Sequence, residues 1–124
     1  MDEQLLKRLD LIEYRQELLF RNDNFSRFIF QNKITRQQEE EIKELLESLA
    51  ERLENNVLIS KNSYETKFYE ICPQSKYLYH DAENIIKSLC EDGQYIELFI
   101  ALYGGDSLKH KDYIDKLIKN NAVI

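Results

Sequence analysis

Apolar residues recur along the first segment of the chain at the spacing of an α-helix, and they predict a helix over residues 3–21. Its apolar stripe advances by four, three and then seven residues, and Gln16 fills the gap in that stripe. The stripe consists of Leu5, Leu9, Ile12 and Leu19, and a second apolar set on another side consists of Leu11, Tyr14 and Leu18. A helix that is apolar on two sides needs cover either from other helices of its own chain or from a second copy of the protein.

Polar capping residues mark where the next two helices begin. The Asn-Asp-Asn segment at 22–24 ends the first helix and can cap a short one, whose aromatic cluster is expected to face the core. Thr35 can cap a long helix that runs to about Asn55, and Gln38 completes a capping box. The aromatic cluster is Phe25, Phe28, Ile29 and Phe30, and the long helix carries the apolar stripe Ile42, Leu45, Leu46, Leu49 and Leu53.

Four more helices or helical segments are predicted in the second half of the chain. Ser63 is expected to cap a helix over about 64–72 that Pro73 ends, and Asp81 is expected to cap the helix 82–92. Gly93 then separates this helix from the segment 94–103, and the segment 104–107 precedes a last helix over about 108–119. The residues expected to be buried are Tyr64, Phe68, Ile71, Ala82, Ile85, Ile86, Leu89, Tyr95, Leu98, Phe99, Leu102, Leu108, Ile114, Leu117 and Ile118.

Length and composition place these helices in one domain. A chain of 124 residues can enclose one modest core, and with only three Gly and one Pro it favours long helices over a turn-rich β fold. We predict an all-α fold over residues 1–124, with five to six helices around one core and the helix at 36–54 as its long central element.

The charge balance bears on what the protein binds. The formal net charge is −6, which argues against direct binding of nucleic acid and against docking on an anionic membrane. A protein partner is therefore expected. The sequence shows no leader peptide and no apolar run long enough to cross a membrane, so we expect a cytoplasmic protein with reduced thiols. Its richness in Ile, Lys, Asn and Tyr is typical of A/T-rich coding, as in low-GC bacteria or their phages.

The chain lacks the residue constellations of an enzyme. Its two histidines are in no paired-His spacing and adjoin no catalytic serine or cysteine turn, and no phosphate or dinucleotide loop is present. We predict no catalytic residue and no cofactor. Carboxylates are abundant, but each can be placed on a solvated helix face.

A zinc site is the one metal possibility that the residue types suggest. Its four potential ligands lie 8, 10 and 20 residues apart, without the close pairs that zinc sites show. The ligands would be Cys72, His80, Cys90 and His110. We predict no metal, both cysteines in the core and both histidines on the surface.

Glutamates on the long helix form an acidic ridge, because they follow one another at steps of four and three residues. The ridge consists of Glu40, Glu44, Glu47, Glu51 and Glu54. Within residues 37–59, seven Glu against two basic residues contribute −5 of the formal charge of −6. Either the ridge is a solvated face that keeps the domain soluble, or it contacts a basic partner.

Three features, in this order, resemble the YhaI-like family of small uncharacterised proteins from low-GC Gram-positive bacteria. They are Glu13-Tyr14 followed by Leu18-Leu19, Ile34-Thr35 with Gln37-Gln38, and the stretch LCEDGQYIEL at 89–98. The resemblance spans about residues 5–100; the segment between Leu19 and Ile34 is shorter than in the family, and the C-terminal helix at 104–124 is an addition. It implies an all-helical fold that associates with itself, and no known activity.

From these observations we expect a cytosolic protein-interaction module, with regulation as one role it could serve, that binds a protein partner and also itself. The self-association residues would be Leu5, Leu9, Ile12 and Leu19, and the partner-binding residues would be Glu40, Glu44, Glu47, Glu51 and Glu54. The alternative is an acidic inhibitor of phage or mobile-element type, which mimics nucleic acid and blocks a DNA- or RNA-binding protein.

Overall fold

Seven α-helices and one 3-10 turn are present in the computed structural model, which describes residues 2–75, 80–105 and 107–121. They are α1 (Glu3–Arg21), α2 (Asn24–Gln31), α3 (Arg36–Glu54), α4 (Lys61–Ile71), η1 (Pro73–Ser75), α5 (Asp81–Glu91), α6 (Ile96–Tyr103) and α7 (Ser107–Asn121). The all-α prediction is confirmed. The predicted number of five to six helices is wrong, because all seven of the predicted helical segments form separate helices. The short segment is α2, capped by Asp23, whose carboxylate accepts a 2.6 Å bond from the Ser26 amide.

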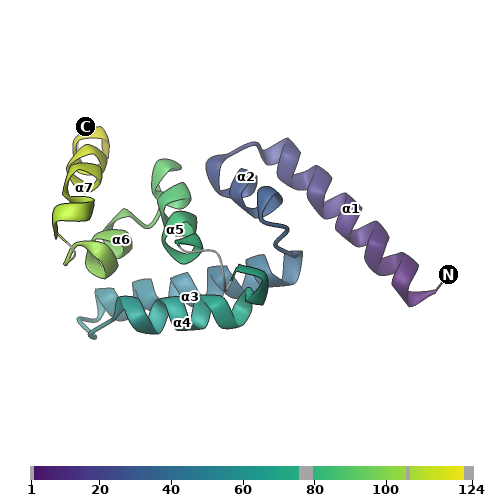
Figure 1. Ribbon diagram of the computed structural model, residues 1–124, viewed down its shortest axis with the longest axis horizontal. Coiled ribbons are helices and arrows are strands. Elements are labelled where there is room, and N and C mark those ends of the chain that lie inside the picture. Colours follow the sequence, from purple (N-terminus) through teal and green to yellow (C-terminus); the bar gives the residue numbers. More distant parts are fainter. Residues whose placement is uncertain (1, 76–79, 106, 122–124) are drawn as a thin grey trace.

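The helices form a compact body from which α1 projects. In Figure 1, α3 and α4 lie side by side, and α2, α5 and α6 stand on the same side of this pair. Helix α1 packs on α2 and extends away from the body toward its N-terminus, while α7 packs on α6 at the other end. None of the described helices is long and apolar enough to cross a membrane.

The centre of the core is α5 rather than α3. Eight of the eleven residues of α5 are buried, because α2, α4 and α6 all pack against it. The prediction that the long helix is the central element is therefore wrong. Helix α3 lies at the side of the body, where Ile42, Leu46 and Leu49 face the core. Most of its glutamates are exposed to solvent, but Glu39 is buried.

The predicted caps are right for α3 and wrong for α4 and α5. Thr35 and Gln38 form the expected capping box. Helix α4 begins three residues earlier than expected, because the Ser60 hydroxyl, and not Ser63, accepts the capping bond, which comes from the Ser63 amide. Asp81 is the first residue of α5 rather than its cap; its side chain is buried.

Gly93 forms the predicted corner between α5 and α6. Its φ of +82° is a left-handed conformation that favours glycine. The Gly93 amide donates to the Cys90 carbonyl (2.9 Å) and the Gln94 amide to the Leu89 carbonyl (2.8 Å), which is the bonding of a Schellman motif. Helix α6 begins at Ile96, two residues later than predicted, because Tyr95 is also left-handed.

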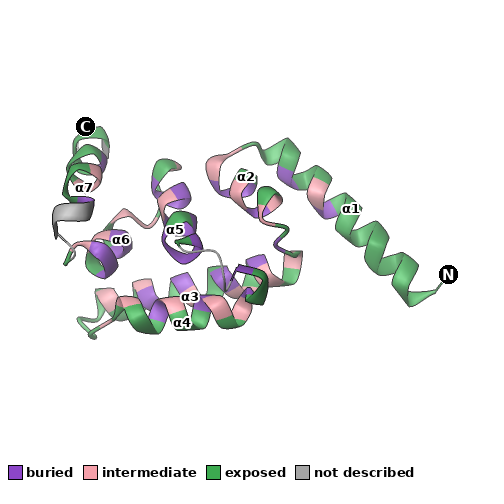
Figure 2. Cartoon of the chain, viewed as in Figure 1, coloured by how far each residue is buried: buried purple, intermediate pink, exposed green. Residues whose placement is uncertain are grey.

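The predicted core residues are mostly confirmed. Tyr64, Phe68, Ile85 and Phe99 have no exposed surface, but Ile118 is 49% exposed and is wrongly predicted. The side chain of Leu108, and residue 106 of the predicted stop, lie outside what the structure describes. Figure 2 shows that buried residues are concentrated in the body, whereas most of α1 is exposed.

Candidate protein-interaction surface

One side of α1 attaches the helix to the body. Tyr14 and Leu18, one turn apart, are its only buried residues. The Tyr14 hydroxyl donates to the buried carboxylate of Glu39 on α3, which also accepts bonds from Arg21 (3.1 and 3.2 Å) and from Lys43 (2.6 Å). Burial by itself raises the pKa of Glu39, but the bonds from Lys43 and Tyr14 and the charges of Lys43 and Arg21 lower it below its ordinary value. Glu39 is therefore an anionic anchor for α1.

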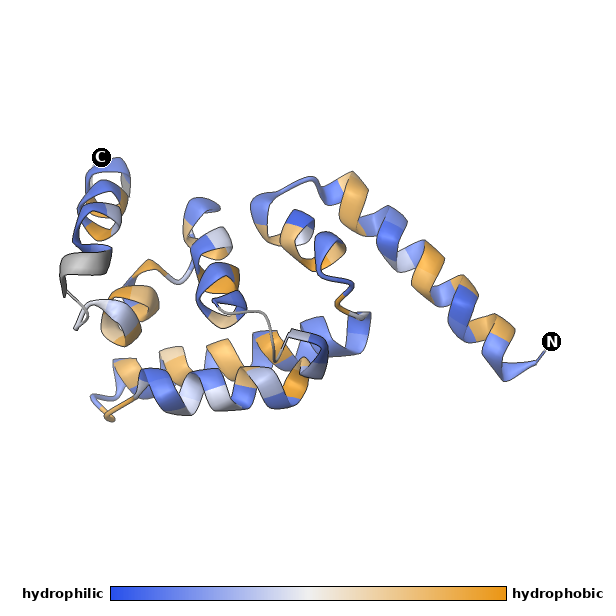
Figure 3. Ribbon diagram, viewed as in Figure 1, coloured by the Kyte–Doolittle hydropathy of each residue, from blue (hydrophilic) through white to orange (hydrophobic). Residues whose placement is uncertain are grey.

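The opposite side of α1 carries the predicted apolar stripe, and it is exposed. With Leu9 and Gln16 at heptad position a, Leu5, Ile12 and Leu19 occupy position d of a coiled-coil pattern. We call these five residues the seam. The exposed fractions of Leu5, Leu9, Ile12 and Leu19 are 43%, 43%, 54% and 59%. Figures 2 and 3 together show exposed hydrophobic bands along α1.

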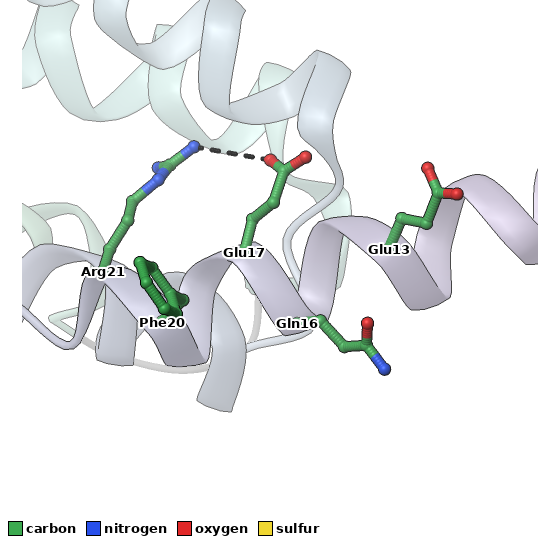
Figure 4. A pocket seen from close by; sticks show the side chains of 5 residues that line it. All are labelled: Glu13, Gln16, Glu17, Phe20 and Arg21. Atoms are coloured by element: carbon green, nitrogen blue, oxygen red, sulfur yellow. Dashed lines mark ion pairs between the residues drawn. The ribbon is translucent and has the colours of Figure 1, made fainter.

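The seam and the anchor lie on opposite sides of α1 because of helical geometry. At about 100° per residue, Tyr14 is about 160° from Gln16, and Leu18 is close to Tyr14. Figure 4 shows Gln16 pointing to the other side of the helix from Glu17 and Arg21, whose side chains pair with each other. The sequence left two ways to cover the stripe, by other helices of the same chain or by a second copy. The structure excludes the first of these within the described part of the chain.

Sequence reasoning missed other apolar residues that widen this surface. Leu6 and Phe20, at heptad position e, are 51% and 92% exposed, and Leu11 is 44% exposed. Phe20 lines a groove on α1 together with Glu13 and Gln16 (Figure 4). A heptad assignment of residues 2–21 would have found both e residues. Leu11 was expected to share the buried side of Tyr14, but the body does not reach it.

The acidic ridge lies where the sequence predicted it. All five glutamates are exposed along one side of α3, and no described residue forms an ion pair with any of them. Glu44, Glu47, Glu51 and Glu54 line a groove on this helix. Glu47 accepts a hydrogen bond from the Tyr95 hydroxyl; burial of Tyr95 and this carboxylate raise the pKa of Tyr95 to about 12.

Two predictions about polar residues are wrong. His110 is buried, with its Nε2 atom 2.7 Å from Oε1 of Glu83, and Lys87 lies 3.1 Å from the same carboxylate. Not every carboxylate is solvated, because Glu39, Asp81 and Glu83 are buried. Burial by itself raises the pKa of Glu83, but the bonds from Lys87 and His110 lower it below its ordinary value. The cluster joins α7 to α5.

The four potential zinc ligands considered above do not come together: in the described part of the chain, no group of three or more potential metal ligands occurs. Cys72 and Cys90 are buried and free, as predicted, and burial raises the pKa of each thiol to about 12. Both thiols are therefore protonated at neutral pH and are poor nucleophiles. His80 is exposed, as predicted.

Comparison with known proteins finds no relative of this chain. The resemblance to the YhaI-like family therefore stays a prediction. No family model, no curated protein and no solved structure matches this chain.

Proposed function

We propose that this protein is a non-catalytic interaction module that binds a helical protein segment through the seam of α1. One observation carries the proposal: the heptad stripe is exposed along the whole of a projecting helix, while the opposite side of that helix is fastened to the body. Contiguous apolar surface of this kind is typical of protein-binding sites. The compartment that we propose is the cytoplasm, where Cys72 and Cys90 would remain reduced.

The energetics favour covering the seam with another helix. Fully burying a Leu or Ile side chain contributes about 1.5–3 kcal/mol, so each half-exposed seam residue has on the order of 1 kcal/mol left to gain. A partner helix would contribute similar amounts from its own apolar stripe. Gln16 would sit inside this interface, and a single polar residue at an a position selects partner and register at some cost in affinity.

The test is an affinity capture that compares the wild-type chain with a variant carrying two new charges on α1 and with a control variant carrying one new charge outside α1. The tagged wild-type chain, the Leu9→Glu/Ile12→Glu variant and the control variant Leu58→Glu are incubated with lysate of the organism that encodes the protein. Leu58 is 95% exposed and lies outside α1, so its substitution controls for lost surface hydrophobicity. We expect a stoichiometric protein, another chain or an untagged copy, to be retained by wild type and Leu58→Glu and lost by the α1 variant.

Two measurements make this result decisive. Circular dichroism and urea unfolding of the α1 variant should match wild type, because the side chains of Leu9 and Ile12 are 43% and 54% exposed in the chain. Retention of the same proteins by all three chains would refute the proposal, since binding would then not require the seam.

A second candidate function is supported by the acidic ridge: an inhibitor that occupies the binding groove of a DNA- or RNA-binding protein. Its five exposed carboxylates form no ion pair with the described residues and suit a basic partner. The test is a Glu44→Lys/Glu51→Lys variant, which spares the Tyr95–Glu47 bond. If the captured partner handles nucleic acid, binds wild type in a salt-sensitive way and is lost by this variant alone, the second candidate replaces the first.

A further inference from the structure

We propose that the occupant of the seam is α1 of a second copy of this chain, running parallel to it and in register. The inference rests on the proposed function of α1 as a binding helix, and it adds the identity and direction of the partner. It depends on the charged residues beside the seam, which set orientation in coiled coils.

The two flanks of the seam differ in charge. Heptad position g is occupied by Arg8 and Arg15, and position e by Leu6, Glu13 and Phe20. In a parallel, in-register pair, each g residue lies beside the e residue five positions further along the partner helix. Arg8 then meets the partner's Glu13, and by symmetry the same pair forms twice.

An antiparallel pair would place like charges together. In that orientation g residues lie beside g residues of the partner, and both g residues here are arginines. Arg8 would face Arg15 when the two helices overlap fully, and Arg8 or Arg15 would face its own counterpart when the register shifts by one heptad. The charge pattern of α1 favours the parallel orientation on this ground alone.

The structure leaves the required charges available. On the body side of α1, Asp10 and Glu17 are taken by Arg36 of α3, at 3.6 and 3.0 Å. Arg8 and Glu13, on the two flanks of the seam, are exposed and have no ion-pair partner among the described residues. The acidic residues on the body side of α1 are thus paired within the chain, whereas Arg8 and Glu13 beside the seam are accessible to a partner helix.

The body does not obstruct this pairing. It is attached to α1 through Tyr14 and Leu18, opposite the seam, so the bodies of two copies would lie on the outer sides of the helix pair. Residues 2–13 are all exposed, which leaves the first three turns accessible from the seam side. Parallel pairing therefore needs no rearrangement of the described helices.

The decisive experiment is a charge-reversal cycle measured by analytical ultracentrifugation at low salt, with wild type, Arg8→Glu, Glu13→Arg and the double variant. Wild type should self-associate. Each single reversal should weaken association about three- to thirty-fold, since two exposed pairs are lost per dimer. The double variant should recover to within about threefold of wild type, because it exchanges the two charges. High salt should reduce all these differences.

Lys7→Glu is the matched control, with the same change of charge as Arg8→Glu. Lys7 pairs with Glu3 within α1 and lies on the body side of the helix, so this change should alter association less than about twofold. Unfolding by urea should be the same for all variants under dissociating conditions, because Arg8 and Glu13 are exposed.

Three outcomes would overturn the inference. Tighter association of Arg8→Glu would indicate antiparallel pairing, because this change relieves contact between arginines. Failure of the double variant to recover would show that Arg8 and Glu13 do not meet. A monomeric wild type at about 100 μM, well above ordinary micromolar affinities, would exclude a second copy as the occupant. In all three cases the capture experiment with Leu9→Glu/Ile12→Glu still tests the proposed function separately.

Discussion

Replacing the Glu39 anchor by glutamine should loosen α1 from the body and reduce the free energy of unfolding. Glu39 is 5% exposed and accepts bonds from Tyr14, Arg21 and Lys43. Hydrogen bonds to a charged group contribute about 1.5–3 kcal/mol. Water can solvate Arg21 and Lys43 after the substitution, since their side chains are 36% and 50% exposed, and the amide oxygen can still accept from Tyr14. We therefore expect Glu39→Gln to cost about 2 kcal/mol, within roughly 1–3.

The same change has a predicted pH dependence. Because the pKa of Glu39 in the folded state lies below its ordinary value of 4.5, its contribution is complete well above that value and is lost as the pH falls through the folded pKa. The difference in unfolding free energy between wild type and Glu39→Gln should be constant above about pH 6 and shrink toward zero in acid.

Urea unfolding followed by circular dichroism across this pH range measures the effect. Glu40→Gln is the matched control: it removes the same charge from the neighbouring, exposed residue and should change stability by less than about 0.5 kcal/mol. A Glu39→Gln cost no larger than that of the control, or a cost that persists undiminished in acid, would refute the reasoning that an ionised Glu39 anchors α1.

Three further substitutions test the fold. Leu46→Ala should cost about 2–5 kcal/mol in urea unfolding because Leu46 has no exposed surface, whereas Leu58→Ala, at 95% exposure, should cost less than about 0.5; equal costs would contradict the core assignment. Gly93→Ala should cost about 1 kcal/mol because of its left-handed backbone, and a neutral result would argue against this corner. Asp92→Ala should cost about 1–2 kcal/mol, since the Asp92 carboxylate accepts from two backbone amides at the start of α2 at 3.1 and 3.0 Å; unchanged stability would show that these bonds contribute nothing.

Local signals predicted most of the helical architecture. The capping box at Thr35 and Gln38 and the corner at Gly93 depend on residues three to five positions apart. The local residue pattern is therefore enough to predict both features. The cap of α4 was misplaced because Ser60 and Ser63 are equally able to cap, and the choice between them depends on how Tyr64 and Phe68 reach the core.

Long-range contacts explain the remaining errors. His110 and Glu83 are 27 residues apart, and nothing near either residue indicates that α7 brings them together in the core. Glu39 likewise meets Tyr14 from 25 residues away, so its role as an anchor has no local signal. Burial of a polar group is stable only where partners satisfy it, and those partners are known only once the helices are packed.

For the candidate surface, the pattern of residues alone predicts the helix α1, its heptad stripe at Leu5, Leu9, Ile12 and Leu19, and the glutamates along α3. Periodicity along one helix suffices for each of these, since neighbours three and four residues apart share a face. Which side of α1 docks on the body depends instead on how the helices pack. Tyr14 and Leu18 are buried because α1 packs on α2 and the Tyr14 hydroxyl donates to the Glu39 carboxylate of α3, and this leaves the stripe in solvent.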